Sequence, residues 1–226
     1  MKEQNEENTQ VIERTGFTGK VLNFFEKYEK PLCIAGIVIL VCIIGIFAIS
    51  KFYVQPRNVR AAEEMFAAEQ WFSNNDYELA LNGNDDHLGF ADIIDDYGCT
   101  KSGNLAKYYA GVCQLRLGKY KEAIDFLKSY KGKDTFTKAE ALMLLGDANA
   151  ELNNDKEAVK YYEKAAKSNE NFVISPAALF KAGAIYALSL NDKTNALRCF
   201  NAIIDNYPES IERNDAEQMV SYAEAL

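Results

Sequence analysis

Histidine is almost absent, since His87 is the only one in 226 residues. Two-histidine zinc sites, including the HExxH helix of metalloproteases, are therefore excluded. Proline is scarce too, with four in the chain, and no Walker-type phosphate loop, GxGxxG or GxSxG motif occurs. The usual sequence signs of nucleotide binding and of nucleophilic catalysis are missing. The sequence therefore predicts no catalytic residue, cofactor, metal or small-molecule substrate.

Basic residues are outnumbered, at 25 Lys and Arg against 33 Asp and Glu. Because nucleic-acid binding needs a basic footprint, we expect none. The charge is uneven: residues 61–100 hold ten acidic residues and no Lys or Arg, while residues 116–138 hold seven basic ones. This contrast is either an ordinary solvated surface or a means of orienting protein partners.

The acidic turn "NGNDDHLG" at 82–89 contains His87. It lacks the alternating ligands and the distal Glu of a calcium loop, so we expect a solvated loop. The acids of the following "FADIIDDY" fit the polar face of a helix better than an acid–base pair.

Residues 31–50, "PLCIAGIVILVCIIGIFAIS", carry no charge. Twenty helical residues span about 30 Å, the thickness of the hydrocarbon core of a bilayer. We predict one transmembrane helix over 31–54. A cleaved signal peptide is the alternative, and it fits less well because thirty residues precede the run.

The polar segment 1–30 precedes the span, with apolar residues at helical spacing near its end: Phe17, Val21, Phe24, Phe25 and Tyr28. They predict either an amphipathic helix on the membrane surface or a helical lead-in to the span. Three basic residues flank each side of the span, so charge alone does not orient it.

A repeated pattern fills the rest of the chain. Gly111, Gly146 and Gly183 lie 35 and 37 residues apart. Each is followed 12 or 13 residues later by an alanine, at Ala123, Ala158 and Ala196. The position between them is filled by Gly118, then by Asn153 and Asn154, then by Asn191 and Asp192, and Pro208 closes the last unit. An earlier, degenerate unit has Ala68 and Ala80 with a break at Asn74 and Asn75.

These offsets describe a helix hairpin. The first small residue lets the partner helix approach, the middle residue adopts the left-handed conformation that ends the first helix, and the alanine marks the crossing. The aromatic pairs after the alanines are expected to fill the seam to the next hairpin. The pattern resembles the tetratricopeptide repeat, whose unit is about 34 residues.

The predicted fold is all-α: the transmembrane helix, then a tetratricopeptide-type α-solenoid over 58–226. We place repeats at about 58–100, 104–138, 139–175 and 176–208, with a capping helix at 209–225. In such folds the first helix of each hairpin lines a concave groove. The candidates for the groove are large and apolar: Met65, Tyr108, Val112, Met143 and Phe180. The alternative is that some of them are buried against neighbouring helices.

The five cysteines include no CxxC pair. Cys113 and Cys199 are expected to be buried thiols, which suit a reducing compartment slightly better than an oxidising one.

A closer resemblance rests on "KFYVQPR", "LALNG", "LGFADIIDDYG" and "NLAKYYAG" at the start of the repeats. With the single span, they resemble the YfgM-like family of membrane-anchored tetratricopeptide proteins, which are ancillary subunits of the SecYEG translocon. The resemblance implies the bacterial inner membrane, a cytoplasmic N-terminus and an extracytoplasmic repeat domain. It also implies work with the translocon, periplasmic chaperones or exported chains.

Two functions follow. The first is a membrane-tethered adaptor or chaperone whose groove holds protein segments. The second is a structural scaffold of an outer-membrane assembly or Tol-Pal-type envelope complex, without a client groove.

Overall fold

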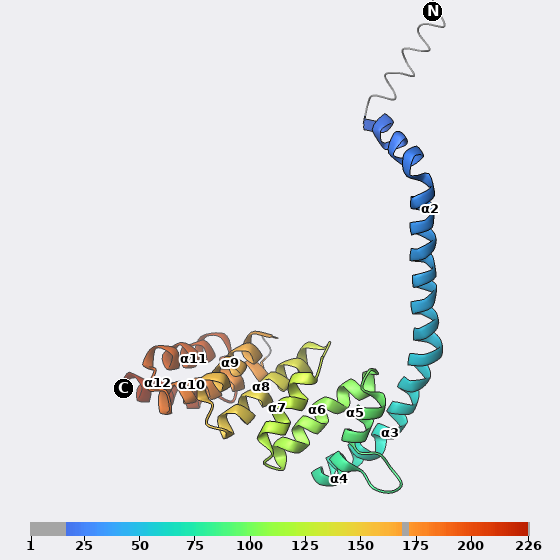
Figure 1. Ribbon diagram of the computed structural model, residues 1–226. Coiled ribbons are helices and arrows are strands. Elements are labelled where there is room, and N and C mark those ends of the chain that lie inside the picture. The colour runs from blue at the N-terminus through green and yellow to red at the C-terminus, as the bar shows by residue number, and fades with distance from the viewer. Residues whose placement is uncertain (1–16, 169–171, 226) are drawn as a thin grey trace, which may run out of the picture. The chain divides into compact units, whose positions relative to one another are not determined.

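The computed structural model describes residues 17–168 and 172–225, with the backbone alone for residues 17–29, 32 and 33. Every regular element in these ranges is a helix (Figure 1). In chain order they are α2 (Phe17–Ile49), the π-helix η1 (Ser50–Val54), α3 (Gln55–Ser73), α4 (Tyr77–Asn82), α5 (Phe90–Tyr97), α6 (Lys101–Arg116), α7 (Tyr120–Ser129), α8 (Thr135–Glu151), α9 (Asp155–Ser168), α10 (Ile174–Leu188), α11 (Lys193–Asn206) and α12 (Arg213–Glu224). The all-α prediction is confirmed.

The chain forms two compact units, one up to Pro56 and one from Arg57 onward, which we describe separately. The first unit is built on α2, whose large apolar side chains from Ile34 to Ile49 are all exposed. By length and composition this helix is able to cross a membrane. It continues through Pro31 instead of beginning there. The backbone of the expected amphipathic lead-in is part of α2. The side chains of the lead-in lie outside the described residues.

The second unit is a row of antiparallel helix hairpins: α6 with α7, α8 with α9, and α10 with α11, followed by α12. The hairpin turns share a left-handed residue. Asn75, Gly118, Asn153 and Asn191 have φ of +64°, +74°, +57° and +50°. Glycine and asparagine are the residues that adopt this conformation most readily, which explains why each first helix ends where it does.

A glycine on each first helix faces a bulky side chain on the second. A Cβ atom on Gly146 would lie 2.5 Å from Cδ1 of Tyr162, and one on Gly183 would lie 2.7 Å from Cε1 of Phe200. On Gly111 it would lie 2.6 Å from Cγ of Leu127. The crossing alanines Ala123, Ala158 and Ala196 are fully buried.

The aromatic pairs are a correction to the sequence analysis. The second member of each pair, which is Leu127, Tyr162 or Phe200, packs onto the glycine of its own hairpin. It does not fill the seam to the next hairpin. The first member, such as Phe126 or Tyr161, packs against the core of the preceding hairpin. The two roles alternate because neighbouring residues of a helix point about 100° apart.

The first hairpin is irregular. Its second arm is split into α4 and α5 by the loop 83–89, within which Asn84 Oδ1 accepts hydrogen bonds from the backbone of Asp86 and His87 (3.0 and 2.8 Å). Met65 and Ala68 of α3 pack against α4, α5 and α6 in one buried cluster. Ala80 is fully buried in the same cluster, and Pro208 is exposed in the turn after α11.

Candidate functional site

The first helices α6, α8 and α10 lie next to one another in the row. The Glu140 carboxylate of α8 acts on the pKa of Tyr108 of α6, and the Lys181 ammonium of α10 donates to Asp147 Oδ1 of α8 at 2.6 Å. These interactions join the faces that the three helices present on one side of the row, which is the side expected to be concave in this type of fold. The candidate site is this face.

On α8 a stripe runs through Phe136, which is exposed, and through Glu140, Met143 and Asp147, which are half-buried, at the spacing of one helical face. Two depressions flank it. The first, which we name the acid-rimmed pocket, has a volume of about 380 Å³. Apolar side chains form its walls, and three glutamates belong to its lining. It is built by α8, the start of α10 and the turn between α11 and α12.

The second depression, the polar pocket, measures about 550 Å³ and lies at the other end of the same helices. Its charged and hydroxyl-bearing side chains are Arg116, Tyr120, Asp147, Glu151, Tyr162 and Lys181. Asp147 Oδ1 also accepts from the Tyr162 hydroxyl at 2.7 Å. Asp147 thus ties α9 and α10 to α8, and Lys181 is held in an ion pair.

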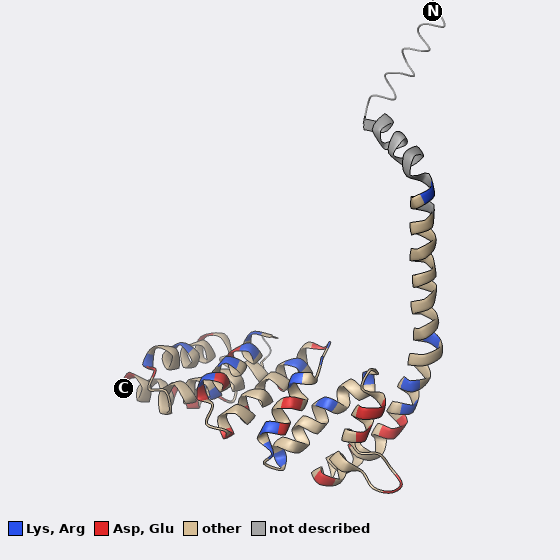
Figure 2. Cartoon of the chain, in the orientation of Figure 1, with Lys and Arg blue, Asp and Glu red and all other residues tan. Residues whose placement is uncertain are grey.

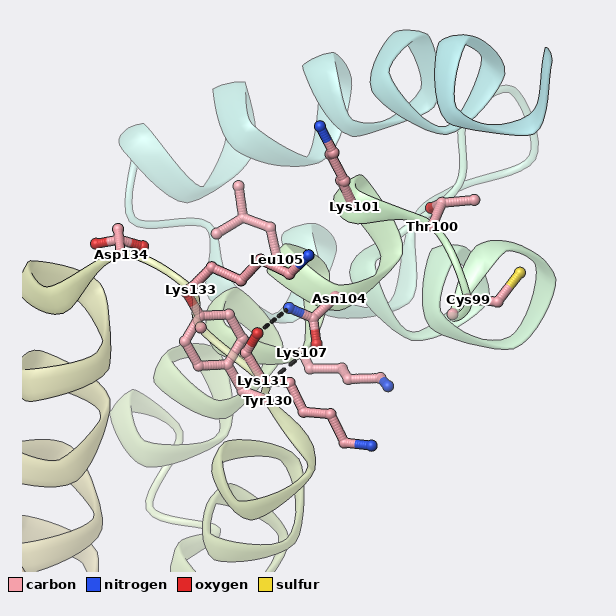
Figure 3. Close-up of a pocket in the computed structure, with 12 residues that line it drawn as sticks. Cys99, Thr100, Lys101, Asn104, Leu105, Lys107, Tyr130, Lys131, Lys133 and Asp134 are labelled. Carbon is pink, nitrogen blue, oxygen red and sulfur yellow. Dashed lines mark hydrogen bonds between the residues drawn. The ribbon is translucent and has the colours of Figure 1, made fainter. Parts of the chain in front are cut away.

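A third cavity of about 660 Å³, the basic pocket, lies between the start of α6 and the loop joining α7 to α8 (Figure 3). Asn104 binds the backbone of Lys131 twice, accepting at 2.9 Å and donating at 3.1 Å. Four lysines surround the cavity: Lys101, Lys107, Lys131 and Lys133. In Figure 3, the side chains of Lys107 and Lys131 extend in the same direction. Figure 2, in which Lys and Arg are blue and Asp and Glu are red, shows that α4 and α5 carry acidic residues instead.

Burial sets the chemistry of the buried tyrosines and thiols. Desolvation, together with the Glu140 carboxylate, raises the pKa of Tyr108 far above its ordinary range. Burial raises the pKa of Cys113 to about 12 and that of Cys199 to about 11. Because the thiolate is the reactive form, the raised pKa values make these two buried thiols less reactive.

The five predicted groove residues do not form one surface. Met143 lines the acid-rimmed pocket. Tyr108 is half-buried, with its ring 5.7 Å from that of Tyr130. Phe180 packs on Phe200 at 5.8 Å between ring centres.

For Met65 and Val112 the groove prediction is wrong, because they are only 3% and 7% exposed in the core. On α10, Ala177 lines the acid-rimmed pocket, and Lys181 and Ala184 line the polar pocket. The pocket-lining residue is therefore Lys181 and not the neighbouring Phe180, which the sequence pattern places in the groove. Sequence reasoning missed Phe136 and Ile211. The only available signal was that each is a large apolar residue beside a helix start.

Among the described residues, no group of three or more His, Cys, Asp or Glu side chains is placed to hold a metal ion. His87 is exposed and packs edge-on against Trp71, at 6.3 Å between ring centres. The site offers apolar contact, carboxylates and ammonium groups, which are the means of recognising a protein segment.

The fold and its concave face define a helical-repeat interaction scaffold. Family models of the tetratricopeptide repeat match residues 90–136, 139–172 and 177–210. The matches together cover about half of the chain, which therefore belongs to the tetratricopeptide repeat family. The matches begin at Phe90, so the predicted first repeat over 58–100 overlaps them only at its end.

Solved structures agree with the fold. A crystal structure of MamA protein has a TM-score of 0.55 at 19% identity, over 72% of this chain and 89% of that one. A second MamA crystal structure has a TM-score of 0.52, also at 19% identity, over 70% of this chain and 92% of that one. At such identity the likeness shows the fold alone. No curated protein matches the chain.

Proposed function

We propose that this tetratricopeptide protein is a membrane-anchored interaction module that serves as a translocon-associated adaptor or chaperone for exported or envelope proteins. It is not an enzyme and binds no nucleic acid. Its partners are the SecYEG translocon, periplasmic chaperones or exported chains, as the YfgM-like resemblance implies. The concave face is where those partners bind.

One observation carries the interaction role. Among the described residues of the second unit, eight large apolar side chains are exposed, and four of them, Phe136, Phe172, Val173 and Ile211, line the acid-rimmed pocket. Scattered apolar residues are normal on a surface, whereas a cluster in a depression is typical of a binding site.

The anchoring role rests on α2. Its residues 31–49 carry no charge, and the large apolar side chains from Ile34 to Ile49 are exposed, an arrangement that is unfavourable in water and suits a bilayer. The family resemblance supports a cytoplasmic N-terminus and an extracytoplasmic repeat domain in a bacterial inner membrane.

The test is photocrosslinking in membranes from cells that express the full chain. The photoreactive residue p-benzoyl-phenylalanine replaces Phe136, and the matched control replaces Lys160, which is exposed on α9. We expect several products of different mass at position 136 and few at position 160. Equal yields at the two positions would contradict a binding role for the concave face.

The scaffold remains the second candidate, because the Lys181–Asp147–Tyr162 network holds part of the concave face in one arrangement. A fixed surface suits one permanent partner. A single stoichiometric crosslink product at position 136 would favour this scaffold over the adaptor.

A further inference from the structure

The acid-rimmed pocket combines apolar walls with one sign of charge. Phe136, Phe172 and Ile211 are 51%, 69% and 91% exposed, and Met143 and Ala177 lie between them. Three segments far apart in the sequence meet here: the start of α8, the start of α10 and the turn before α12.

Every charged side chain in the described lining of this pocket is a carboxylate: Glu140, Glu209 and Glu212. The Glu140 carboxylate also contributes to raising the pKa of the neighbouring Tyr108 hydroxyl. The lining contains no Lys or Arg to neutralise these groups. A positive partner charge would therefore be attracted, and a negative one repelled.

The basic pocket gives an internal contrast. Its charged lining is four lysines and Asp134. The second unit thus presents two depressions of opposite charge. Of these two, only the acid-rimmed pocket contains exposed large apolar side chains.

We propose that the acid-rimmed pocket binds a peptide segment in which a large apolar side chain is flanked by Lys or Arg. This proposal rests on the proposed function and specifies the chemistry of the partner. The volume of 380 Å³ is near the lower end of the range for ligand pockets, about 300–1,000 Å³, which suits an anchoring side chain more than a whole folded surface.

The probe is a fluorescent dodecapeptide, GSKKLFLKKSGS, tested by fluorescence anisotropy against the full chain in detergent. Two matched peptides replace all four lysines with serine or with glutamate. We expect the lysine peptide to bind at least about tenfold more tightly than the glutamate peptide, with the serine peptide between them. The advantage of the lysine peptide should shrink as salt is added, because exposed charges are screened.

Two variants separate the charges from the apolar walls. The triple variant Glu140→Gln, Glu209→Gln, Glu212→Gln should weaken the lysine peptide several-fold and leave the serine peptide unchanged. The glutamine at position 140 still offers an acceptor to Tyr108. The double variant Phe136→Ser, Ile211→Ser should weaken both peptides.

The control is Phe66→Ser, which removes a phenylalanine of α3 that is 69% exposed and outside the pocket. It should bind all three peptides as the unchanged chain does. Circular dichroism confirms that each variant is folded.

Equal affinity for the lysine and glutamate peptides, or a triple variant that binds the lysine peptide normally, would overturn the proposal. So would a concentration-dependent dimer in light scattering that Phe136→Ser, Ile211→Ser dissolves while no peptide binds, since a second copy would then be the occupant. If crosslinks form at position 136 without a charge preference for peptides, only this inference fails. If the charge preference holds but position 136 crosslinks no more than position 160, only the proposed function fails.

Discussion

At the scale of single residues, the glycine and the bulky residue that faces it set the distance between paired helices. Gly146 is in contact with the Tyr162 ring, and Gly183 with that of Phe200. A side chain at either glycine would have to displace a buried ring. The crossing alanines leave equally little room, because protein interiors are close-packed.

Ala158→Leu should therefore destabilise the fold by about 1–3 kcal/mol through overpacking. Thermal unfolding of the full chain in detergent should show a melting temperature lower by roughly 2–12 °C. The control is Lys160→Leu, which adds an apolar side chain at an exposed site of the same helix and should shift the melting temperature little. An unchanged melting temperature in Ala158→Leu would contradict the crossing geometry.

Asp134 caps the N-terminus of α8. Hydrogen bonds from the Thr137 hydroxyl and N–H (2.6 and 2.7 Å) lower the pKa of its carboxyl group. Asp134→Ala should cost about 1 kcal/mol near neutral pH, the usual effect of losing an N-cap.

The pH dependence of this cap has a definite sign. A lowered folded-state pKa means that the stabilisation is present above the unfolded aspartate pKa of about 3.9 and is lost as the pH falls through the folded-state value. Urea unfolding should thus show the gap between the unchanged chain and Asp134→Ala closing below about pH 4. Asp134→Asn, which keeps an acceptor, should show no such closing.

At the scale of elements, side-chain hydrogen bonds tie the α8–α9 hairpin to the α10–α11 hairpin. Asp147 of α8 accepts from Tyr162 of α9 and Lys181 of α10. Glu163 of α9 likewise accepts from the Tyr186 hydroxyl of α10 at 3.0 Å and from Arg198 of α11. Each acid therefore links two successive repeats.

A double-mutant cycle of Tyr162→Phe with Asp147→Ala should give a coupling free energy of about 0.5–1.5 kcal/mol, since the bond is partly shielded from water. The matched cycle is Glu157→Ala with Lys160→Ala, whose side chains are 52% and 61% exposed. It should give a smaller coupling free energy, because water screens an exposed ion pair. Equal couplings would mean that the Asp147 network contributes no more than a surface ion pair.

At the scale of the whole molecule, the proposal assigns membrane anchoring to α2 and partner binding to the second unit. If α2 is an anchor and not a cleaved signal, the intact mass of the purified protein should include residues 1–50. Protease added to spheroplasts should cleave residues 58–226, and protease added to inverted membrane vesicles should not. A mature protein that begins near residue 51 would contradict anchoring, and digestion in inverted vesicles would contradict the proposed topology.

The sequence alone determined the helices and the turns between them. Asn75, Gly118 and Asn153 mark the turns because a left-handed backbone is a local property of the residue type. The apolar run can likewise be recognised from its length and composition, which do not depend on contacts with other segments.

Only the tertiary structure decided which surface is open. Phe180 and Lys181 are neighbours in the sequence, yet a rotation of about 100° places one against Phe200 and the other in the concave face. The sequence pattern placed Met65 in the groove, but in the structure α4, α5 and α6 cover it. Phe136 and Ile211 lie 75 residues apart, and they share a pocket because the repeats stack, a relation that no local pattern encodes.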